Sequence, residues 1–287
     1  MIIASFSTTP DRLIKGLPTR CINTLLSQDK RADLILINIP HVSQKGVVYD
    51  KDLAAKLQQP GVIVNWVDTD YGPITKLYGT LEFIEREKLS NVRIILVDDD
   101  VQYESWVFQR LIDDGGHAVG YVSRDPILSW GRVTDTKWTH GSSGKTAILE
   151  TYAGVMYDAS IFLPYNEFRD WERSLPMNCR KADDMTIAAW VHKKGYIPER
   201  LTANINHVNH DAAGTDELNM INTVGNNTAV LQILFDRFEF APWQSLLSYL
   251  LSALISYWPI LALLVAATIW VKLDKSGHKV RRSRSDD

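Results

Sequence analysis

The sequence predicts an α/β protein in which helices flank a central, mostly parallel sheet. Strand-like and helix-like stretches alternate from the N-terminus to Asp100, which is the pattern of a parallel sheet covered by helices. The expected strands are nearly continuous apolar runs, as strands buried on both faces are. Polar loops follow these runs, and an open α/β sheet binds its ligands at that edge. With 287 residues, 45% of them hydrophobic, the chain can bury a sizeable core.

Each element is assigned from its local composition. Apolar, β-branched runs predict strands at residues 2–7, 34–39, 62–67 and 93–97. The first run lacks the basic region and the long apolar region of a signal peptide, and we interpret it as a strand. Apolar residues at helical spacing predict helices at residues 17–27, 51–58 and 75–87.

The regular alternation fades after Asp100. Residues 119–123 and 153–157 are predicted strands, and residues 131–145 are interpreted as a polar loop. We expect this second half to shape an acceptor site, because variable loops on a fixed scaffold usually carry specificity. A net charge of -3 argues against nucleic-acid binding, and two cysteines are too few for a disulfide framework.

The composition changes sharply near the C-terminus, where no charged residue occurs between Glu239 and Lys272. This interval exceeds the roughly 20 residues that cross a bilayer. We therefore expect residues 1–239 to form a folded domain, residues 240–271 a membrane segment, and residues 272–287 a basic tail. The alternative is a buried helical hairpin within the soluble fold.

Pro259 lies near the middle of the apolar segment and is expected to bend or break a helix there. The segment is then either one kinked transmembrane helix or a re-entrant helical hairpin. Basic residues after it favour a cytoplasmic tail, and without a signal peptide the preceding domain is expected in the cytosol. The re-entrant form satisfies both demands, so we predict a membrane-associated protein with a cytosolic catalytic domain.

Three adjacent carboxylates, Asp98, Asp99 and Asp100, directly follow the predicted strand at residues 93–97. Adjacent carboxylates repel one another unless they are solvated or bridged by a cation. Magnesium and manganese are typically held by one or two carboxylates together with phosphate oxygens. The triplet is therefore a predicted metal site, with an exposed acidic turn as the alternative.

Two other loops offer groups for a nucleotide. Thr8 and Arg12 follow the first strand and supply a hydroxyl and a cation, although an ordinary capped turn explains them equally well. After the third strand, Asp70 precedes a Gly-Pro turn, and Lys76 falls in the first turn of the next helix. A cation is unfavourable at a helix N-terminus unless an anion compensates, which makes Lys76 a phosphate-contact candidate. The alternative is a solvated lysine.

A second acidic pair, Asp183 and Asp184, begins a predicted amphipathic helix that ends near Gly195. These residues either complement the helix dipole or include a base that takes a proton from an acceptor hydroxyl. Further along, His207 and His210 lie in a polar stretch. Either imidazole is a candidate metal ligand, and a surface position is the alternative for each.

Taken in order, these motifs resemble the landmarks of GT-A glycosyltransferases. The resemblance covers about residues 1–212 and rests on Ser-Thr-Thr-Pro-Asp-Arg after the first strand, Asp-Tyr-Gly-Pro with Thr-Lys, Asp98 to Asp100, and Ala-Asp-Asp with Gly-Tyr. It is closest to small glycosyltransferase domains of large algal viruses and assorted microbes. The chain departs from the pattern at Ala182, where inverting members carry a Glu before the catalytic Asp.

The resemblance implies a nucleotide-sugar donor held by Mn²⁺ or Mg²⁺. It implies metal ligation by Asp100 and Asp98, with His207 or His210 reaching the metal. Asp98 is also implied to lie near the ribose or sugar. The implied nucleotide-binding residues are Thr8, Arg12, Asp70, Lys76, Asp98 and Asp99. The catalytic base is Asp183 or Asp184, with Asp183 favoured by its position.

The resulting hypothesis is a metal-dependent glycosyltransferase that moves a sugar to a hydroxyl of a membrane-associated glycan or lipid-linked acceptor, with inversion implied by the resemblance. Trp130, Trp138 and Trp171 are candidates for stacking on a sugar ring, with packing as the alternative. Two rival classes remain. One is a membrane-anchored nucleotide-sugar-binding module without turnover. The other is a metal-dependent phosphatase or phosphotransferase, which would normally carry its acidic nucleophile on an early strand.

Overall fold

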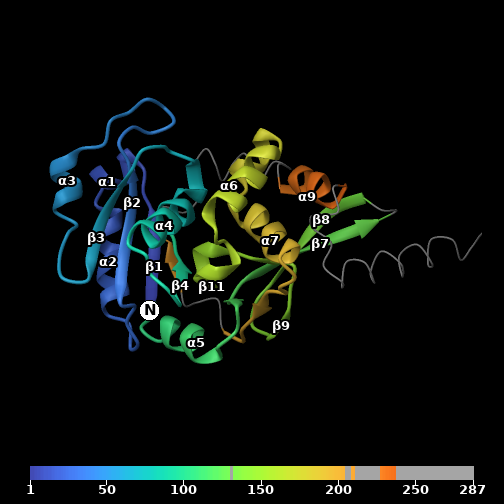
Figure 1. Cartoon of the computed structure of the whole chain (residues 1–287). Coiled ribbons are helices and arrows are strands. Elements are labelled where there is room, and N and C mark those ends of the chain that lie inside the picture. The colour runs from blue at the N-terminus through green and yellow to red at the C-terminus, as the bar shows by residue number, and fades with distance from the viewer. Residues whose placement is uncertain (130–131, 204–207, 211–226, 237–287) are drawn as a thin grey trace, which may run out of the picture.

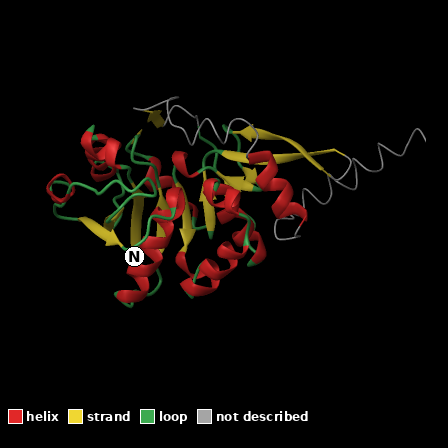
Figure 2. Ribbon diagram, turned by 90° about the horizontal axis from the view of Figure 1, so that it is seen from above, coloured by secondary structure: helices red, strands yellow, loops and turns green. Residues whose placement is uncertain are grey.

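An eight-stranded, mostly parallel sheet organises the protein, and helices cover both of its faces (Figure 1; Figure 2). The computed structural model describes residues 1–129, 132–203, 208–210 and 227–236. The strand order is β3-β2-β1-β4-β11-β6-β12-β9. In chain order these strands are β1 (Ile2–Ser7), β2 (Leu34–Pro40), β3 (Val62–Val67), β4 (Arg93–Leu96), β6 (Ala118–Gly120), β9 (Gly144–Lys145), β11 (Val155–Asp158) and β12 (Glu199–Arg200).

The direction of the strands defines where a ligand is expected. β1 pairs in parallel with both β2 and β4, β2 pairs in parallel with β3, and β11 runs antiparallel to β4 and β6. The chain builds β1, β2 and β3 outward and then returns to place β4 on the other side of β1. The strand order therefore reverses between β1 and β4, and open α/β sheets bind ligands at such a switch point. The predicted mixed α/β class with a mostly parallel sheet is confirmed.

The helices divide between the two faces of this sheet. One face is covered by α1 (Pro10–Ile14), α2 (Leu17–Leu26), α3 (Lys51–Ala55) and α5 (Val107–Asp114). The other is covered by α4 (Thr75–Arg86), α6 (Tyr165–Ser174) and α7 (Asp183–Lys193). Two large apolar cores result, one on each face. Burial on both faces explains why the first four strands are mostly apolar.

A smaller unit lies beside the main sheet and projects from it in Figure 1. Its three strands are β7 (Ser123–Ser129), β8 (Arg132–Thr139) and β10 (Ile148–Leu149), and its helix is α9 (Asn227–Asp236). A third core cluster joins Val133 of β8 to α7 and α9. Two remaining strands, β5 (Val101–Tyr103) and β13 (Val208–His210), form an antiparallel pair.

The first four strands and three helices lie where the sequence predicted them. β1 and β3 have the predicted limits, and α2, α3 and α4 begin at the predicted residues and end slightly earlier. The interpretation of residues 131–145 as a polar loop is wrong, because β8 and β9 occupy most of it. β8 pairs only with β7 and its side chains are mostly exposed, so it lacks the apolar run that identifies a buried strand.

Helix α4 packs unusually close to the sheet at Gly79. A β-carbon at this position would lie 2.4 Å from Oδ1 of Asn38 and 2.8 Å from a methyl carbon of Val67. Asn38 is held in place because its Nδ2 donates to Ser5, Thr80 and the carbonyl oxygen of Lys76. Glycine is therefore required for the close approach of α4 to β2 and β3.

Replacing Gly79 by alanine is expected to destabilise the fold. The added methyl group must displace either the Asn38 network or α4, and overpacking of this kind typically costs about 1–3 kcal/mol. Urea denaturation would measure the change in the free energy of unfolding. Gly46→Ala provides the comparison for strain without a clash, because a β-carbon added there would have no atom within 4 Å but the backbone has φ +77°. Equal stability of Gly79→Ala and the parent would contradict the expectation.

His192 of α7 supplies a pH-dependent contribution to stability. Its Nε2 lies 2.9 Å from the carbonyl oxygen of Ala147, and burial lowers the pKa of His192 below its ordinary value. A lowered pKa means that the unfolded chain binds a proton more readily. The stability contributed by neutral His192 is therefore complete above the unfolded pKa and is lost as the pH falls below about 6.5. As the pH is lowered from 7.5 to about 5, the free energy of unfolding should fall less steeply for His192→Gln than for the parent, as urea denaturation at each pH would measure.

Among the described residues, no helix is both long and apolar enough to span a bilayer. The predicted membrane segment at residues 240–271 and the basic tail at residues 272–287 lie outside the described residues.

Candidate functional site

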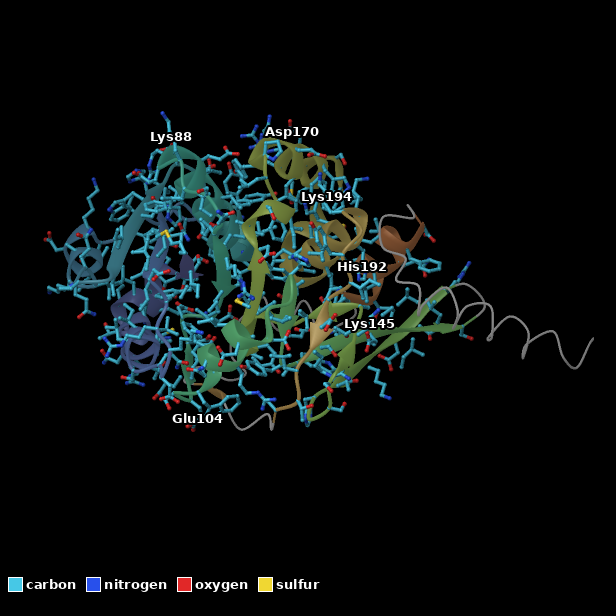
Figure 3. All side chains as sticks on the ribbon, turned by 60° about the horizontal axis from the view of Figure 1, so that its bottom comes forward. Lys88, Glu104, Lys145, Asp170, His192 and Lys194 are labelled. Carbon is cyan, nitrogen blue, oxygen red and sulfur yellow. The ribbon has the colours of Figure 1, made fainter. Side chains whose placement is uncertain are left out.

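The candidate site lies at the carboxyl edge of the sheet, where β1 and β4 meet. β1 leads into Thr8 and α1, and β4 leads through Val97 into the acidic triplet. α4 begins at this edge and runs back along the sheet. Lys88, just beyond α4, and Glu104, whose carbonyl oxygen accepts from Gln28 just beyond α2, lie on opposite sides of the molecule in Figure 3 because these two helices cover opposite faces of the sheet. Six of the predicted nucleotide-binding and metal-binding residues thus lie at the switch point: Thr8, Arg12, Lys76, Asp98, Asp99 and Asp100.

The central member of the triplet, Asp99, faces the protein interior and is 1% exposed. Its Oδ2 accepts from the hydroxyl of Thr8 at 2.5 Å, and its Oδ1 lies 2.5 Å from Nη1 of Arg12. Burial raises the pKa of Asp99 to about 6, while Arg12 and Thr8 act in the opposite direction. In this structure Asp99 therefore joins the β1 loop to the β4 loop and holds Arg12 in position.

The outer members of the triplet face two different cations. Asp100 Oδ2 lies 2.9 Å from Nη2 of Arg12, and Asp98 Oδ1 lies 2.8 Å from Nζ of Lys76. The Asp98 side chain is 34% exposed, so a ligand can reach it from solvent. The backbone N–H of Asp98 donates to the Tyr103 hydroxyl at 2.9 Å, which fixes the start of the acidic turn. The three carboxylates of the triplet thus have different partners, and the central one, Asp99, is fixed in the protein interior.

Lys76 connects the two acidic sites that the sequence predicted. It is 4% exposed, which excludes the solvated lysine. Its Nζ donates to Asp98 at 2.8 Å and to Thr151 at 2.7 Å, and lies 3.2 Å from Oδ2 of Asp183. Burial alone would lower the pKa of Lys76, but the neighbouring carboxylates outweigh it and raise the pKa above its ordinary value. The anions that compensate this first-turn lysine are therefore carboxylates of the protein itself.

A buried polar network fixes the helix turn that carries Lys76. The Ser5 and Thr80 hydroxyls donate to its carbonyl oxygen at 2.7 and 2.8 Å, and the Asn38 amide donates to it at 3.1 Å. Asn65 in turn donates to Oδ1 of Asn38 at 2.8 Å. Polar residues inside the apolar strands β2 and β3 were the available sequence signal for this network.

The two acids at the start of α7 have different surroundings. Oδ1 of Asp184 accepts from the backbone N–H and the hydroxyl of Thr151, at 3.1 and 2.7 Å. Oδ2 of Asp183 is buried and makes no hydrogen bond to any described residue, although the ammonium of Lys76 lies 3.2 Å away. Neither acid caps the helix, because the cap residue is Ala182. Asp183 thus retains hydrogen-bonding capacity that Asp184 has already used.

Glu150 and Arg124 form a part of the site that the sequence did not indicate. Glu150 is 5% exposed and its Oε1 lies 2.7 Å from Nε of Arg124. Burial, then Asp183 and Glu150, raise the pKa of Asp184 well above its ordinary value. The ion pair of Glu150 with Arg124 joins two separate segments and has no local sequence pattern.

Three predicted site residues lie apart from this cluster or outside the described residues. Asp70 joins two loops, because its carboxylate accepts from the backbone N–H of Gly72 at 2.8 Å and of Gln44 at 2.9 Å. The backbone of His210 pairs with Val101, directly after the triplet. His207 lies outside the described residues.

The donor chemistry of the triplet suits a hard divalent cation. No group of three or more His, Cys, Asp or Glu in the described part of the chain forms a complete metal site by itself. Mg²⁺ and Mn²⁺ need only one or two carboxylates when phosphate oxygens supply other ligands. Asp98 and Asp100 offer those two carboxylates at the switch point. The residues therefore fit a cation that arrives together with a phosphate-bearing ligand.

Comparison with solved structures yields many similarities, all three of those given below at 13% sequence identity or less. No protein-family model and no curated protein matches the sequence. The chain is similar to a 4-diphosphocytidyl-2C-methyl-D-erythritol synthase, at a TM-score of 0.48 and 12% identity, over 80% of this chain and 98% of that one. It is similar to a nucleoside-diphosphate-sugar pyrophosphorylase from Vibrio cholerae, at a TM-score of 0.43 and 13% identity, over 73% and 95% of the two chains.

The third similarity is to residues 1–349 of TarS from S. aureus, at a TM-score of 0.42 and 11% identity. It covers 71% of this chain and 58% of that one. At these scores none of the three structures assigns the chain to a family. Function must therefore be inferred from the geometry of the site itself.

Proposed function

We propose that this protein is a GT-A-type glycosyltransferase that moves a sugar from a nucleotide-sugar donor to a hydroxyl of an acceptor. The observation that carries the proposal is the position of Lys76. Its ammonium lies within 3.2 Å of Asp98 in the triplet and of Asp183 at the start of α7. A phosphate-binding region and a candidate base are therefore adjacent, as the displacement of a nucleoside diphosphate by a hydroxyl requires.

In the proposed donor complex, Asp98 and Asp100 hold Mn²⁺ or Mg²⁺ together with the donor phosphates. When bound, the cation neutralises charge that develops on the phosphate oxygens of the leaving group. Arg12 and Lys76 add two fixed positive charges at the same edge of the sheet. Asp99 acts through Arg12, which it holds in position.

Asp183 is the proposed base. Its buried Oδ2 has no hydrogen bond to a described residue and can accept the proton of an incoming hydroxyl. Asp184 is less suited, because its Oδ1 already accepts from the backbone N–H and the hydroxyl of Thr151. Asp184 instead positions Thr151, which also accepts from Lys76. Attack opposite the leaving group would invert the anomeric carbon, in line with the sequence-based expectation.

The membrane-associated acceptor, the cytosolic location and the roles of His207 and His210 remain part of this proposal. Donor binding, donor turnover and phosphate release distinguish this proposal from the binding module and the phosphatase. A binding module would take up the donor without transferring or hydrolysing it. A phosphatase would release phosphate from simple monoesters.

Calorimetric titration of the full-length chain with UDP-glucose, UDP-galactose, UDP-N-acetylglucosamine and GDP-mannose tests the donor. At least one sugar nucleotide is expected to bind in a Mn²⁺-dependent manner. Asp98→Asn and Asp100→Asn are each expected to weaken binding by on the order of tenfold or more, since each removes a charged ligand. Asp113→Asn is the matched control, because Asp113 is exposed and pairs only with Lys30 among the ion pairs of the described residues. Binding of no sugar nucleotide with either cation would overturn the proposal.

A further inference from the structure

The hairpin formed by β7 and β8 presents an exposed tryptophan. Trp138 is 46% exposed and is the only tryptophan among the exposed large apolar side chains of the described residues. The other two tryptophans that the sequence singled out differ from it. Trp171 packs 5.1 Å from the ring of Trp190, and Trp130 lies outside the described residues.

The guanidinium group of Arg124 covers one face of the Trp138 ring. Arg124 is its partner across the two strands, and the guanidinium carbon of Arg124 lies 4.0 Å from the ring centroid. Arg124 is itself fixed by the ion pair with Glu150, in which both side chains are largely buried. A ring held this way loses little conformational freedom when a ligand binds, which reduces the cost of binding.

Two chains of contacts connect this ring with the candidate site. Through Arg124 it is linked to Glu150, and Thr151, the next residue along the chain, donates to Asp184 through its backbone N–H and its hydroxyl. On the other side, Trp138 lies 6.2 Å from the ring of Tyr152. The Tyr103 hydroxyl donates to the carbonyl oxygen of Tyr152 and accepts from the N–H of Asp98. These contacts therefore connect the exposed ring to residues that position both acidic sites.

The surroundings of the ring indicate the chemistry of its ligand. Residues two apart on a strand share a face, so Thr136 lies beside Trp138, and Pro126 is the cross-strand partner of Thr136. A hydroxyl, a proline ring and an aromatic face suit the C–H groups and hydroxyls of a sugar. An acyl chain would require exposed aliphatic surface, but the exposed aliphatic residue of this hairpin, Ile127, points to the opposite face.

We propose that the Trp138 face, made of Trp138, Tyr152, Arg124 and Thr136, binds a sugar ring of the acceptor. This inference rests on the proposed function and adds to it that the acceptor carries a saccharide next to the reacting hydroxyl. The nucleotide of the donor lies at the other part of the site, between β1 and β4. Trp138 is therefore a specificity residue for the acceptor and does not contribute to donor binding.

Saturation-transfer NMR on the full-length chain in phosphatidylcholine nanodiscs, which contain no sugar, tests this inference. The probes are the methyl glycosides of glucose, galactose, mannose and N-acetylglucosamine. At least one is expected to receive saturation at its ring protons. Trp138→Ala is expected to weaken that binding by on the order of tenfold, as the loss of a stacking contact of about 1.4 kcal/mol would. Trp138→Phe should retain part of it.

Ile127→Ala is the matched control, since it removes an exposed apolar side chain of the same hairpin from the opposite face. It is expected to bind the glycosides as the parent does. Calorimetry with Mn²⁺ and the four sugar nucleotides is run on every variant, and donor binding should be unchanged. Glycoside binding that is absent in the parent or unaffected by Trp138→Ala overturns the inference while donor binding still supports the proposed function. Donor binding that is lost in Trp138→Ala would place the ring in the donor site and also overturn it.

Discussion

Asp183→Asn is expected to reduce sugar transfer by about 10²–10⁴-fold while leaving donor binding within a fewfold of the parent, which is the range for loss of a general base. Asparagine preserves the volume of the side chain but cannot accept a proton at neutral pH. Asp183 is the suitable residue because its Oδ2 makes no hydrogen bond to a described residue and its side chain is 12% exposed at the edge of the site.

Asp184→Asn is the matched variant, because the two residues are adjacent in the first turn of α7. Oδ1 of Asp184 accepts from the backbone N–H and the hydroxyl of Thr151, and the amide oxygen of an asparagine can accept both bonds. We therefore expect transfer in Asp184→Asn to fall by no more than about tenfold. Transfer rates from initial-velocity assays and donor binding from calorimetry separate the two roles. A larger loss of transfer in Asp184→Asn than in Asp183→Asn would make Asp184 the base and Asp183 the positioning residue.

The part of the fold that the sequence predicts best is the part buried on both faces. β1 to β4 are apolar because helices cover them on either side, and this one-dimensional signal needs no knowledge of the partners. β8 was missed for the opposite reason. Its only sheet partner is β7, and most of its side chains are exposed, so its polar sequence resembles a loop.

The acids and the lysine of the site were predicted from local anomalies, a carboxylate cluster after a strand and a cation in a first helical turn. Their pairing was not, because Lys76, Asp98 and Asp183 come from distant parts of the chain. The same limit applies to Glu150 and Arg124, whose ion pair has no pattern within either segment. The distinct position of Asp99, turned inward toward Thr8, also depends on which way the β4 loop turns.

Lys76→Met is expected to affect both stability and turnover, because this ammonium compensates two carboxylates at once. Its removal leaves Asp183 buried and Asp98 partly buried without their cation. Breaking a buried ion pair typically costs about 3–5 kcal/mol, and we expect about 3 kcal/mol because solvent reaches Asp98. Transfer should fall by about 10²–10³-fold, since a fixed charge beside the leaving group is lost.

The control for this variant is Lys194→Met, which removes a lysine that pairs with Glu167 near the surface. An exposed pair of this kind contributes about 0–1 kcal/mol, so its loss should change the free energy of unfolding little. Urea denaturation measures stability for both variants, and initial velocities measure transfer. A stable and fully active Lys76→Met protein would contradict the central place of Lys76 in the site.

The double variant Lys76→Met/Asp183→Asn separates the two effects. Neutralising Asp183 removes one of the uncompensated charges, so the double variant is expected to be more stable than Lys76→Met alone. Transfer is expected to fall below that of Asp183→Asn alone, because the leaving-group cation is missing as well as the base. Such a further loss at recovered stability would show that the lysine acts in the reaction as well as in the fold. Transfer equal to that of Asp183→Asn alone would reduce Lys76 to a structural counter-ion.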